Sequence, residues 1–409
     1  MSTSDPTVPG PTPPRLRPFR AVRYDEDRAG DLSALVAPPH DDLEPAHARS
    51  QRVRPHHIAR LIYASDPQAA AGQLQRWLRR GVLRRDEHPA LYVYQQQRGA
   101  RILQRGVIGE LPIPRPRGTA RDLLPHEDVS AHVVRQRAAH MAGLRAQLEP
   151  LLLTYRGTRS TATQITHHIT RRTPTAVARV GDTTHLVWAC HDEAETALLS
   201  AGVGTGQALI ADGHHRHAAC LRLGADRSSP WASSLALFVD TVAYPPRLAA
   251  IHRVLPGLDP EKAAAVAAQV ARVRRLPQGP RPPGPDEMVL VGGGGAWTVS
   301  DPEPGALRDA LAGRPPQWAA LPSAVSDHLL IGAAWSVPEL PGAVRHHHDA
   351  AGAVAAVAAP GRGSAVLLPA LGEERVRELA RAGVLLPRKS TSFGPKPAIG
   401  LALRVLGLS

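Results

Sequence analysis

The sequence is nearly devoid of lysine. Of its 49 basic residues only three are lysines, Lys262, Lys389 and Lys396, and arginine serves everywhere else. The compact ammonium of lysine and the planar guanidinium of arginine are not interchangeable where geometry matters. Two of the three lysines stand in one short segment, RKSTSFGPKP. We therefore expect this segment to use the ammonium group for a specific purpose.

Cysteines and long apolar runs are also scarce. The 409-residue chain has two cysteines, Cys190 and Cys220, and we expect two buried thiols rather than a disulfide or a metal site. No apolar run reaches the roughly 18 residues of a membrane-spanning helix. The N-terminus also lacks the order of a signal peptide. A cytoplasmic protein with no membrane partner is therefore expected.

Clustered basic residues are absent, although the chain has a formal net charge of +13. The arginines are spread along the sequence, without a basic run interleaved with aromatic residues and without a recognisable helix-turn-helix. This pattern favours an arginine-rich solvated surface over nucleic-acid binding. A small-molecule substrate is the expected partner, and a homodimer is left open.

The length and pattern of the chain predict a mixed α/β or α+β protein with more than one domain. Hydrophobic residues make up 43% of the chain, and strands and helices mix without strict βαβ order. We expect a disordered tail over 1–14 and an α/β catalytic region over 15–275. A Pro/Gly-rich linker over 276–287 and a second α/β region over 288–409 should follow.

Single elements are predicted from capping and periodicity. A helix is expected over 66–81, with Asp66 as its N-cap. Two alternating runs within 90–111 predict a β-hairpin. Further strands are expected at 33–40 and 398–406.

The segment ALIADGHHRHAACLRLG gathers titratable residues around one glycine. A strand should end at Asp212, Gly213 permits a sharp turn, and a helix should begin at His214. A helix entered this way directs N–H groups and its positive dipole end at the turn, which makes an anion site. His215 and Arg216 would join His214 as charge-assisted donors to phosphate oxygens.

Asp212 indicates a reaction rather than passive binding, because a carboxylate repels a bare phosphate. It is a candidate proton acceptor or magnesium ligand. The alternative is that Asp212 only caps the helix, Arg216 lies on the surface and the histidines are half-buried. The density of such residues around one glycine favours the site. A structural zinc is disfavoured because no cysteine or glutamate stands at ligand spacing.

Three other segments are candidates for binding. In RKSTSFGPKP, the two lysines with Ser390 and Thr391 suit a phosphoryl or carboxylate group, or form a basic surface loop. In LLPHED, His126 and Glu127 are candidates for a substrate-binding and acid–base pair, or for a helix cap. In VAPPHDD, Asp41 is a candidate ligand for a substrate amine or a metal, or part of a rigid turn.

Several segments, in order from about residue 18 to 406, resemble the domain of unknown function 1015 family. They are PFRAVRY with DLSALVAPPHD, RGVLRRDEHPALYVYQQ, LLPHE, IADGHHRHAA, IHRVL and PRKSTSFGPKP. The matching positions include Asp212 to Arg216, Lys389 to Thr391, and Lys396. The chain departs from the family at His40 and His217, where tyrosine is usual, which puts in doubt any role that needs a phenol there.

The D-G-H-H-R segment is also similar to that of ParB/sulfiredoxin-like proteins, including the free-serine kinases of archaea, where it contacts nucleotide phosphates. The resemblance implies a phosphotransferase that uses a nucleotide (ATP or ADP) or pyrophosphate with magnesium, and free serine or a similar hydroxyl compound as acceptor. In that interpretation Asp212, His214, His215 and Glu127 are catalytic. The donor would be bound by Gly213, Arg216, Lys389, Ser390, Thr391 and Lys396. The alternatives are a ParB-like nucleotide-responsive regulatory or DNA-associated protein and a phosphate-ester hydrolase.

Overall fold

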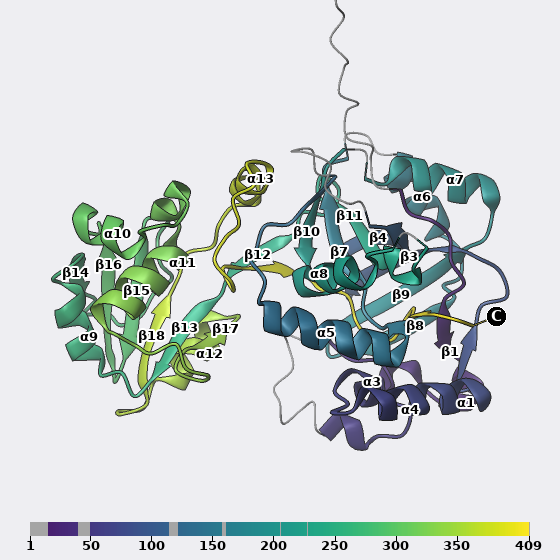
Figure 1. Cartoon of the computed structure of the whole chain (residues 1–409), viewed down its shortest axis with the longest axis horizontal. Helices are drawn as coiled ribbons and strands as arrows, with labels where there is room; N and C mark the ends of the chain where they lie inside the picture. The colour runs from purple at the N-terminus through teal and green to yellow at the C-terminus, as the bar shows by residue number, and fades with distance from the viewer. Residues whose placement is uncertain are drawn as a thin grey trace, which may run out of the picture. The chain divides into compact units, whose positions relative to one another are not determined.

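The computed structural model describes residues 15–39, 50–113, 122–157, 161–204, 206–226 and 228–408. The chain divides into two compact units (Figure 1). Unit 1 comprises the described residues up to Pro125, Val129–Pro246 and those from Pro395 onward. Unit 2 comprises His126–Asp128 and Arg247–Gly394. The chain therefore leaves unit 1 at Arg247 and returns to it at Pro395.

An eight-stranded mixed sheet forms the centre of unit 1. Its strands follow the order β5 (Leu123–Leu124), β10 (Ala208–Asp212), β7 (Leu151–Tyr155), β11 (Ser233–Asp240), β4 (Arg101–Pro112), β3 (Leu91–Arg98), β9 (Thr183–Cys190) and β8 (Ala176–Val180). The pairs β10–β5 and β11–β7 are parallel, and the other neighbours are antiparallel. The predicted hairpin is confirmed as β3 and β4, and the mixed fold class is confirmed.

Helices and two short ribbons complete unit 1. The helices are α1 (Glu26–Ala29), α3 (Ala59–Ile62), α4 (Pro67–Arg79), α5 (Ala131–Leu144), α6 (Thr161–Ile169), α7 (Glu193–Gly202) and α8 (His214–Leu223), with 3-10 turns at Leu32–Ala34 and Pro230–Ala232. The ribbons pair β1 (Val22–Tyr24) with β2 (Leu83–Arg85), and β6 (Ala146–Gln147) with β20 (Arg404–Val405). The predicted helix is α4, and the Asp66 side chain accepts from the backbone N–H groups of Gln68 and Ala69 as its N-cap.

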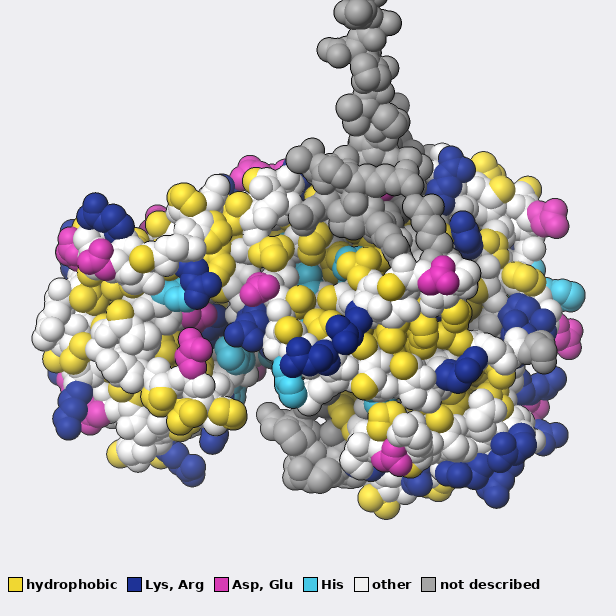
Figure 2. All heavy atoms as spheres, in the orientation of Figure 1, with side chains coloured by type: hydrophobic (Ala, Val, Ile, Leu, Met, Phe, Trp, Pro, Cys, Tyr) yellow, Lys and Arg dark blue, Asp and Glu magenta, His cyan; other side chains and the backbone are white. Residues whose placement is uncertain are grey.

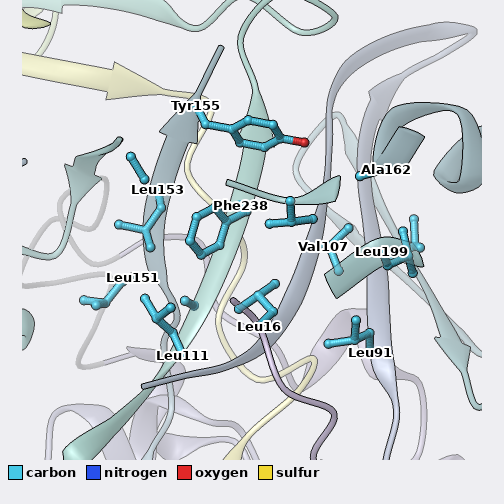
Figure 3. Packing of buried hydrophobic residues seen from close by; sticks show 14 of the residues in the cluster. Leu16, Leu91, Val107, Leu111, Leu151, Leu153, Tyr155, Ala162, Leu199 and Phe238 are labelled. Carbon is cyan, nitrogen blue, oxygen red and sulfur yellow. The ribbon is translucent and has the colours of Figure 1, made fainter. Parts of the chain in front are cut away.

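The main core of unit 1 lies on one face of the sheet (Figure 3). Phe238, Leu153 and Val107 from the central strands pack with Ala162 of α6 and Leu199 of α7. The helices α5 and α8 form a separate cluster, in which Ala138 and Met141 of α5 are buried with Ala219 and Cys220 of α8. Both predicted thiols, Cys190 and Cys220, are buried and free.

Two segments of unit 1 were expected as strands, and neither is a continuous strand. Over 33–40 the described part begins as a 3-10 turn, because the Asp31 side chain accepts from Ser33 N at 2.9 Å and caps it. Over 398–406 only Arg404–Val405 is a strand. Gly400 has a φ of +108°, which lies outside the extended region and interrupts the run.

Unit 2 is built on a six-stranded antiparallel sheet. Its order is β14 (Arg272–Arg275), β16 (Gly295–Ser300), β15 (Glu287–Gly292), β18 (Gly363–Leu367), β13 (His252–Pro256) and β17 (Arg345–His347). A separate ribbon pairs β12 (Arg247–Ala250) with β19 (Thr391–Gly394). The segment 276–287, expected as a linker, runs from the end of β14 to the start of β15 in this unit.

The helices of unit 2 cover both faces of its sheet. They are α9 (Pro260–Ala267), α10 (Pro304–Ala310), the 3-10 turn η4 (Pro316–Ala320), α11 (Pro322–Ala324), the π-helix η5 (Val325–Ala334), α12 (Ala350–Ala356) and α13 (Glu373–Arg381). Alternate side chains of β15 point to opposite faces of the sheet. Leu290 packs with α9 and η5 on one face, whereas Val289 and Val291 pack with α12 on the other.

The charges on the visible surface are mixed. On the face in Figure 2, Lys and Arg side chains occur in separate groups, with Asp and Glu side chains between them. None of the described helices combines the length and apolar character needed to cross a membrane.

Candidate anion-binding site

The turn between β10 and α8 has the predicted form. β10 ends at Asp212, and α8 begins at His214 after Gly213, which has a φ of +99°. A side chain at residue 213 would place its Cβ 2.9 Å from Leu151 Cδ2 and 3.2 Å from Arg216 Cζ. Glycine is therefore required both by the backbone conformation and by the space around it.

Asp212 lies between two cationic side chains. Its Oδ2 accepts from Arg216 Nη2 at 2.5 Å, and its Oδ1 lies 3.0 Å from Lys396 Nζ. All three side chains are largely shielded from solvent, and that of Lys396 is only 9% exposed. Each oxygen of the Asp212 carboxylate therefore pairs with one cation.

Backbone and side-chain contacts hold both cations in place. Arg216 also donates through Nη1 to Pro150 O, and its Nη2 lies 3.6 Å from Glu149 Oε2. The loop that carries Lys396 is held by Gln96, whose Nε2 donates to Lys396 O at 2.7 Å. The donors that face Asp212 are therefore preorganised. Sequence reasoning missed Glu149, because nothing in the sequence marks it as a neighbour of the glycine turn.

The three histidines of α8 differ in their surroundings. His214 and His215 are half-buried, and His215 Nε2 accepts from Ser130 N at 3.2 Å. Burial lowers the pKa of His217 to about 4, so this ring is neutral at pH 7. Its Nε2 is buried and has no hydrogen-bond partner among the described residues. At pH 7 His217 therefore offers no positive charge to an anion.

The other predicted site residues form a second cluster, within unit 2. His126 Nε2 lies 3.0 Å from Thr391 Oγ1, and the His126 ring packs against Phe393. Ser390 Oγ donates to Pro387 O and lies 2.8 Å from Ser323 Oγ. The hydroxyls of Ser390 and Thr391 are both buried, and both contact groups of the protein itself. Their side chains thus shape the RKSTSF segment, and their predicted contacts with a donor stay untested.

Glu127 and the N-cap of α5 are distinct. The helix begins at Ala131 with Ser130 as its N-cap. Glu127 instead forms an isolated parallel bridge with Leu386 in unit 2. Glu127 therefore does not occupy the N-cap position itself. Asp41 and His40 lie outside the described residues.

The donor set at Asp212 does not suit a magnesium ion held by the protein. Each carboxylate oxygen already faces a cationic side chain, whereas magnesium prefers oxygen ligands in octahedral geometry. Groups of three or more metal-binding side chains are also missing from the described part of the chain. The arrangement can offer oriented cationic donors to an anion.

These features define a mixed α/β protein with preorganised cations at the start of a helix. The chain belongs to the family described as protein of unknown function DUF1015, whose model matches residues 16–324. This match confirms the family expected from the sequence motifs. None of the curated proteins matches the chain.

Several solved structures resemble the chain at low sequence identity. A free serine kinase in complex with AMP is 16% identical, with a TM-score of 0.39 over 69% of this chain and 88% of that one. A conserved hypothetical protein from Pyrococcus furiosus is 15% identical, with a TM-score of 0.37 over 68% and 92%. C-terminally truncated SbnI from Staphylococcus aureus is 10% identical, with a TM-score of 0.39 over 73% and 87%.

Substitution of Gly213 by alanine should cost more stability than the same change at Gly181. Both residues have positive φ, so both variants carry backbone strain of about 1–2 kcal/mol. Only at residue 213 would the new Cβ also meet neighbouring atoms, because the space around Gly181 is open. The free energy of unfolding in urea measures the difference. Equal losses would show that the turn at residue 213 relaxes without cost.

The burial of His217 predicts a stability change in acid. Between pH 6.5 and about 4 the unfolded chain binds a proton that the folded His217 does not. The free energy of unfolding should therefore fall as the pH is lowered through this window. In His217→Phe the fall should be smaller, whereas a change at the exposed His132 to Gln should leave it as in wild type. Urea unfolding at several pH values tests this, and identical slopes for His217→Phe and wild type would contradict it.

Proposed function

We propose that the protein is a small-molecule phosphotransferase. The donor is a nucleotide, ATP or ADP, or pyrophosphate, and the acceptor is a small hydroxyl compound, with free serine as the leading candidate. The observation that carries this proposal is the placement of Asp212 between Arg216 and Lys396 at the first turn of α8. The resemblance of the D-G-H-H-R segment to that of free-serine kinases supports the same chemistry.

The geometry suits a transferring phosphoryl group. Phosphoryl transfer needs mainly positioning and stabilisation of negative charge on the phosphate oxygens. Arg216 and Lys396 supply cationic N–H donors, and α8 adds the positive end of its dipole. These groups are held before any anion arrives, so little free energy is spent on arranging them.

The reaction itself moves one phosphoryl group and one proton. The hydroxyl oxygen of the acceptor bonds to the terminal phosphorus, and the bond from phosphorus to the oxygen of the leaving phosphate breaks. The hydroxyl proton passes to a protein base. Asp212 contacts both Arg216 and Lys396, so we assign it the role of orienting these two cations.

A product assay tests the proposal and separates it from its alternatives. The purified protein is incubated with ATP, ADP or pyrophosphate, with and without serine, and the products are separated. Phosphoserine supports the proposal. Inorganic phosphate alone would indicate a hydrolase, and nucleotide binding without turnover would indicate a nucleotide-responsive binding protein.

Asp212→Asn should abolish turnover without weakening donor binding. The change removes the carboxylate that orients both cations, so the transition state loses its aligned donors. It also removes the negative charge that opposes a phosphate, so nucleotide affinity should equal or exceed that of wild type. Calorimetric titration and the product assay measure the two effects. Full activity in this variant would rule out the assigned role.

Arg216→Ala should weaken donor binding by about 2 kcal/mol, the value of a charge-assisted hydrogen bond. The control is Arg222→Ala, because Arg222 lies on the same helix but is exposed to solvent. Nucleotide affinity in the two variants is compared by titration. Equal affinities would exclude Arg216 as a phosphate ligand.

A further inference from the structure

Arg253 is a fully buried arginine of unit 2 that the proposed reaction does not use. It lies on β13 within the IHRVL segment and has no exposed surface. Its guanidinium forms a bidentate pair with Asp327, with Nε–Oδ1 at 2.8 Å and Nη2–Oδ2 at 2.7 Å. The remaining nitrogen, Nη1, donates to the carbonyl oxygens of Ile251 at 2.6 Å and Lys389 at 2.8 Å.

The residue that receives this last contact is conformationally strained. Lys389 has a φ of +59°, which side chains other than glycine rarely adopt. Such a conformation persists only where the surroundings impose it, and it is typical of functional sites. Arg253 fixes the carbonyl of Lys389, while the next two residues, Ser390 and Thr391, are fixed by their own hydroxyl contacts.

Stability alone is a poor explanation for the pair. Burial of the Arg253 guanidinium carries a large desolvation penalty, which Asp327, 28% exposed, offsets only in part, and apolar residues of similar volume often stabilise a protein as well. The bidentate contact with Asp327 instead fixes the plane of the Arg253 guanidinium, and so fixes the direction in which Nη1 donates to Lys389 O. Asp327 stands in the first turn of the π-helix η5, an element type frequent at functional sites.

We propose that Arg253 is a positioning residue that holds Lys389 in its strained conformation and so aims its ammonium group at an anionic group of substrate or donor. This inference rests on the proposed function and on the expectation from the sequence that Lys389 binds the phosphoryl donor. A lysine in the left-handed conformation directs its side chain differently from one in an extended strand. Loss of the Arg253 contact would let residue 389 relax and would displace the ammonium.

The first test measures the environment of the Lys389 side chain by NMR and does not depend on enzyme activity. Protein labelled with 13C-lysine gives only three Cε signals, from Lys262, Lys389 and Lys396, each assigned by a Lys→Arg variant. In Arg253→Gln the Lys389 signal should shift, whereas that of Lys262 in the same unit should stay. Arg377→Gln is the matched control, because Arg377 is equally buried and pairs with Glu373. It should leave the Lys389 signal unchanged.

An unchanged Lys389 signal in folded Arg253→Gln would overturn the proposal, as would an equal shift in Arg377→Gln. If Arg253→Gln does not fold, Asp327→Asn replaces it, because this change keeps the guanidinium and removes only its anchor. The Lys389 signal should shift in that variant too, and a signal at the wild-type position would overturn the proposal.

The second test is a double-mutant cycle on turnover. Arg253→Gln should lower kcat about tenfold in the wild-type background and less than about twofold in Lys389→Met, because it acts through Lys389. Equal effects in both backgrounds would show a merely structural role. If the wild-type protein transfers no phosphoryl group, the proposed function fails, while the lysine signals still decide whether Arg253 positions Lys389.

Discussion

The ion pair between Lys396 and Asp212 is the contact on which the first site depends. It joins the end of β10 to the segment that returns to unit 1 after unit 2 is complete. The Lys396 side chain is only 9% exposed, so its ammonium needs a nearby carboxylate to offset the loss of water. Asp212 meets this need while it also fixes Arg216. One carboxylate is thus shared by both cations, in addition to the contacts that hold each of them separately.

The site also depends on a backbone that only glycine allows. Gly213 reverses the chain so that Asp212 and the first turn of α8 face the same space. Leu151, from the neighbouring strand β7, closes the side where a Cβ would lie. The core strand β7 and the functional turn are therefore packed against each other, and a change in one affects the other.

Local signals in the sequence were enough to predict this turn. Three signals follow one another in the sequence: an apolar run that ends at Asp212, a glycine, and a helical pattern. Each reflects the conformational preference of residues close together in the chain. The same holds for Asp66 as the N-cap of α4. The scarcity of lysine pointed to Lys396, but no spacing rule could pair it with Asp212, because that contact is long-range and forms only when the chain returns to unit 1. The strand expected over 398–406 failed for a local reason, the positive φ of Gly400.

The two lysines of one motif have different surroundings. The chain passes from unit 2 to unit 1 between Gly394 and Pro395, so Lys389 and Lys396 belong to different units. Each lysine is held by a charged side chain, but at a different atom. Lys396 is fixed at its ammonium by Asp212, whereas Lys389 is fixed at its backbone by Arg253. Sequence reasoning treated the segment as one loop, because proximity in sequence was its only measure of proximity in space.

The charges around Asp212 are nearly balanced, which bears on the proposed transfer reaction. In the described part of the chain the two cations face two carboxylates, Asp212 and Glu149, so the cluster offers oriented donors rather than an excess of positive charge. The binding free energy of a phosphate in its ground state therefore gains little from the net charge of this cluster. The donors contribute most when negative charge on the phosphate oxygens comes into line with them during transfer. A site that only stored an anion would gain affinity by losing Asp212, which is the physical reason the proposed function assigns this carboxylate a part in a reaction.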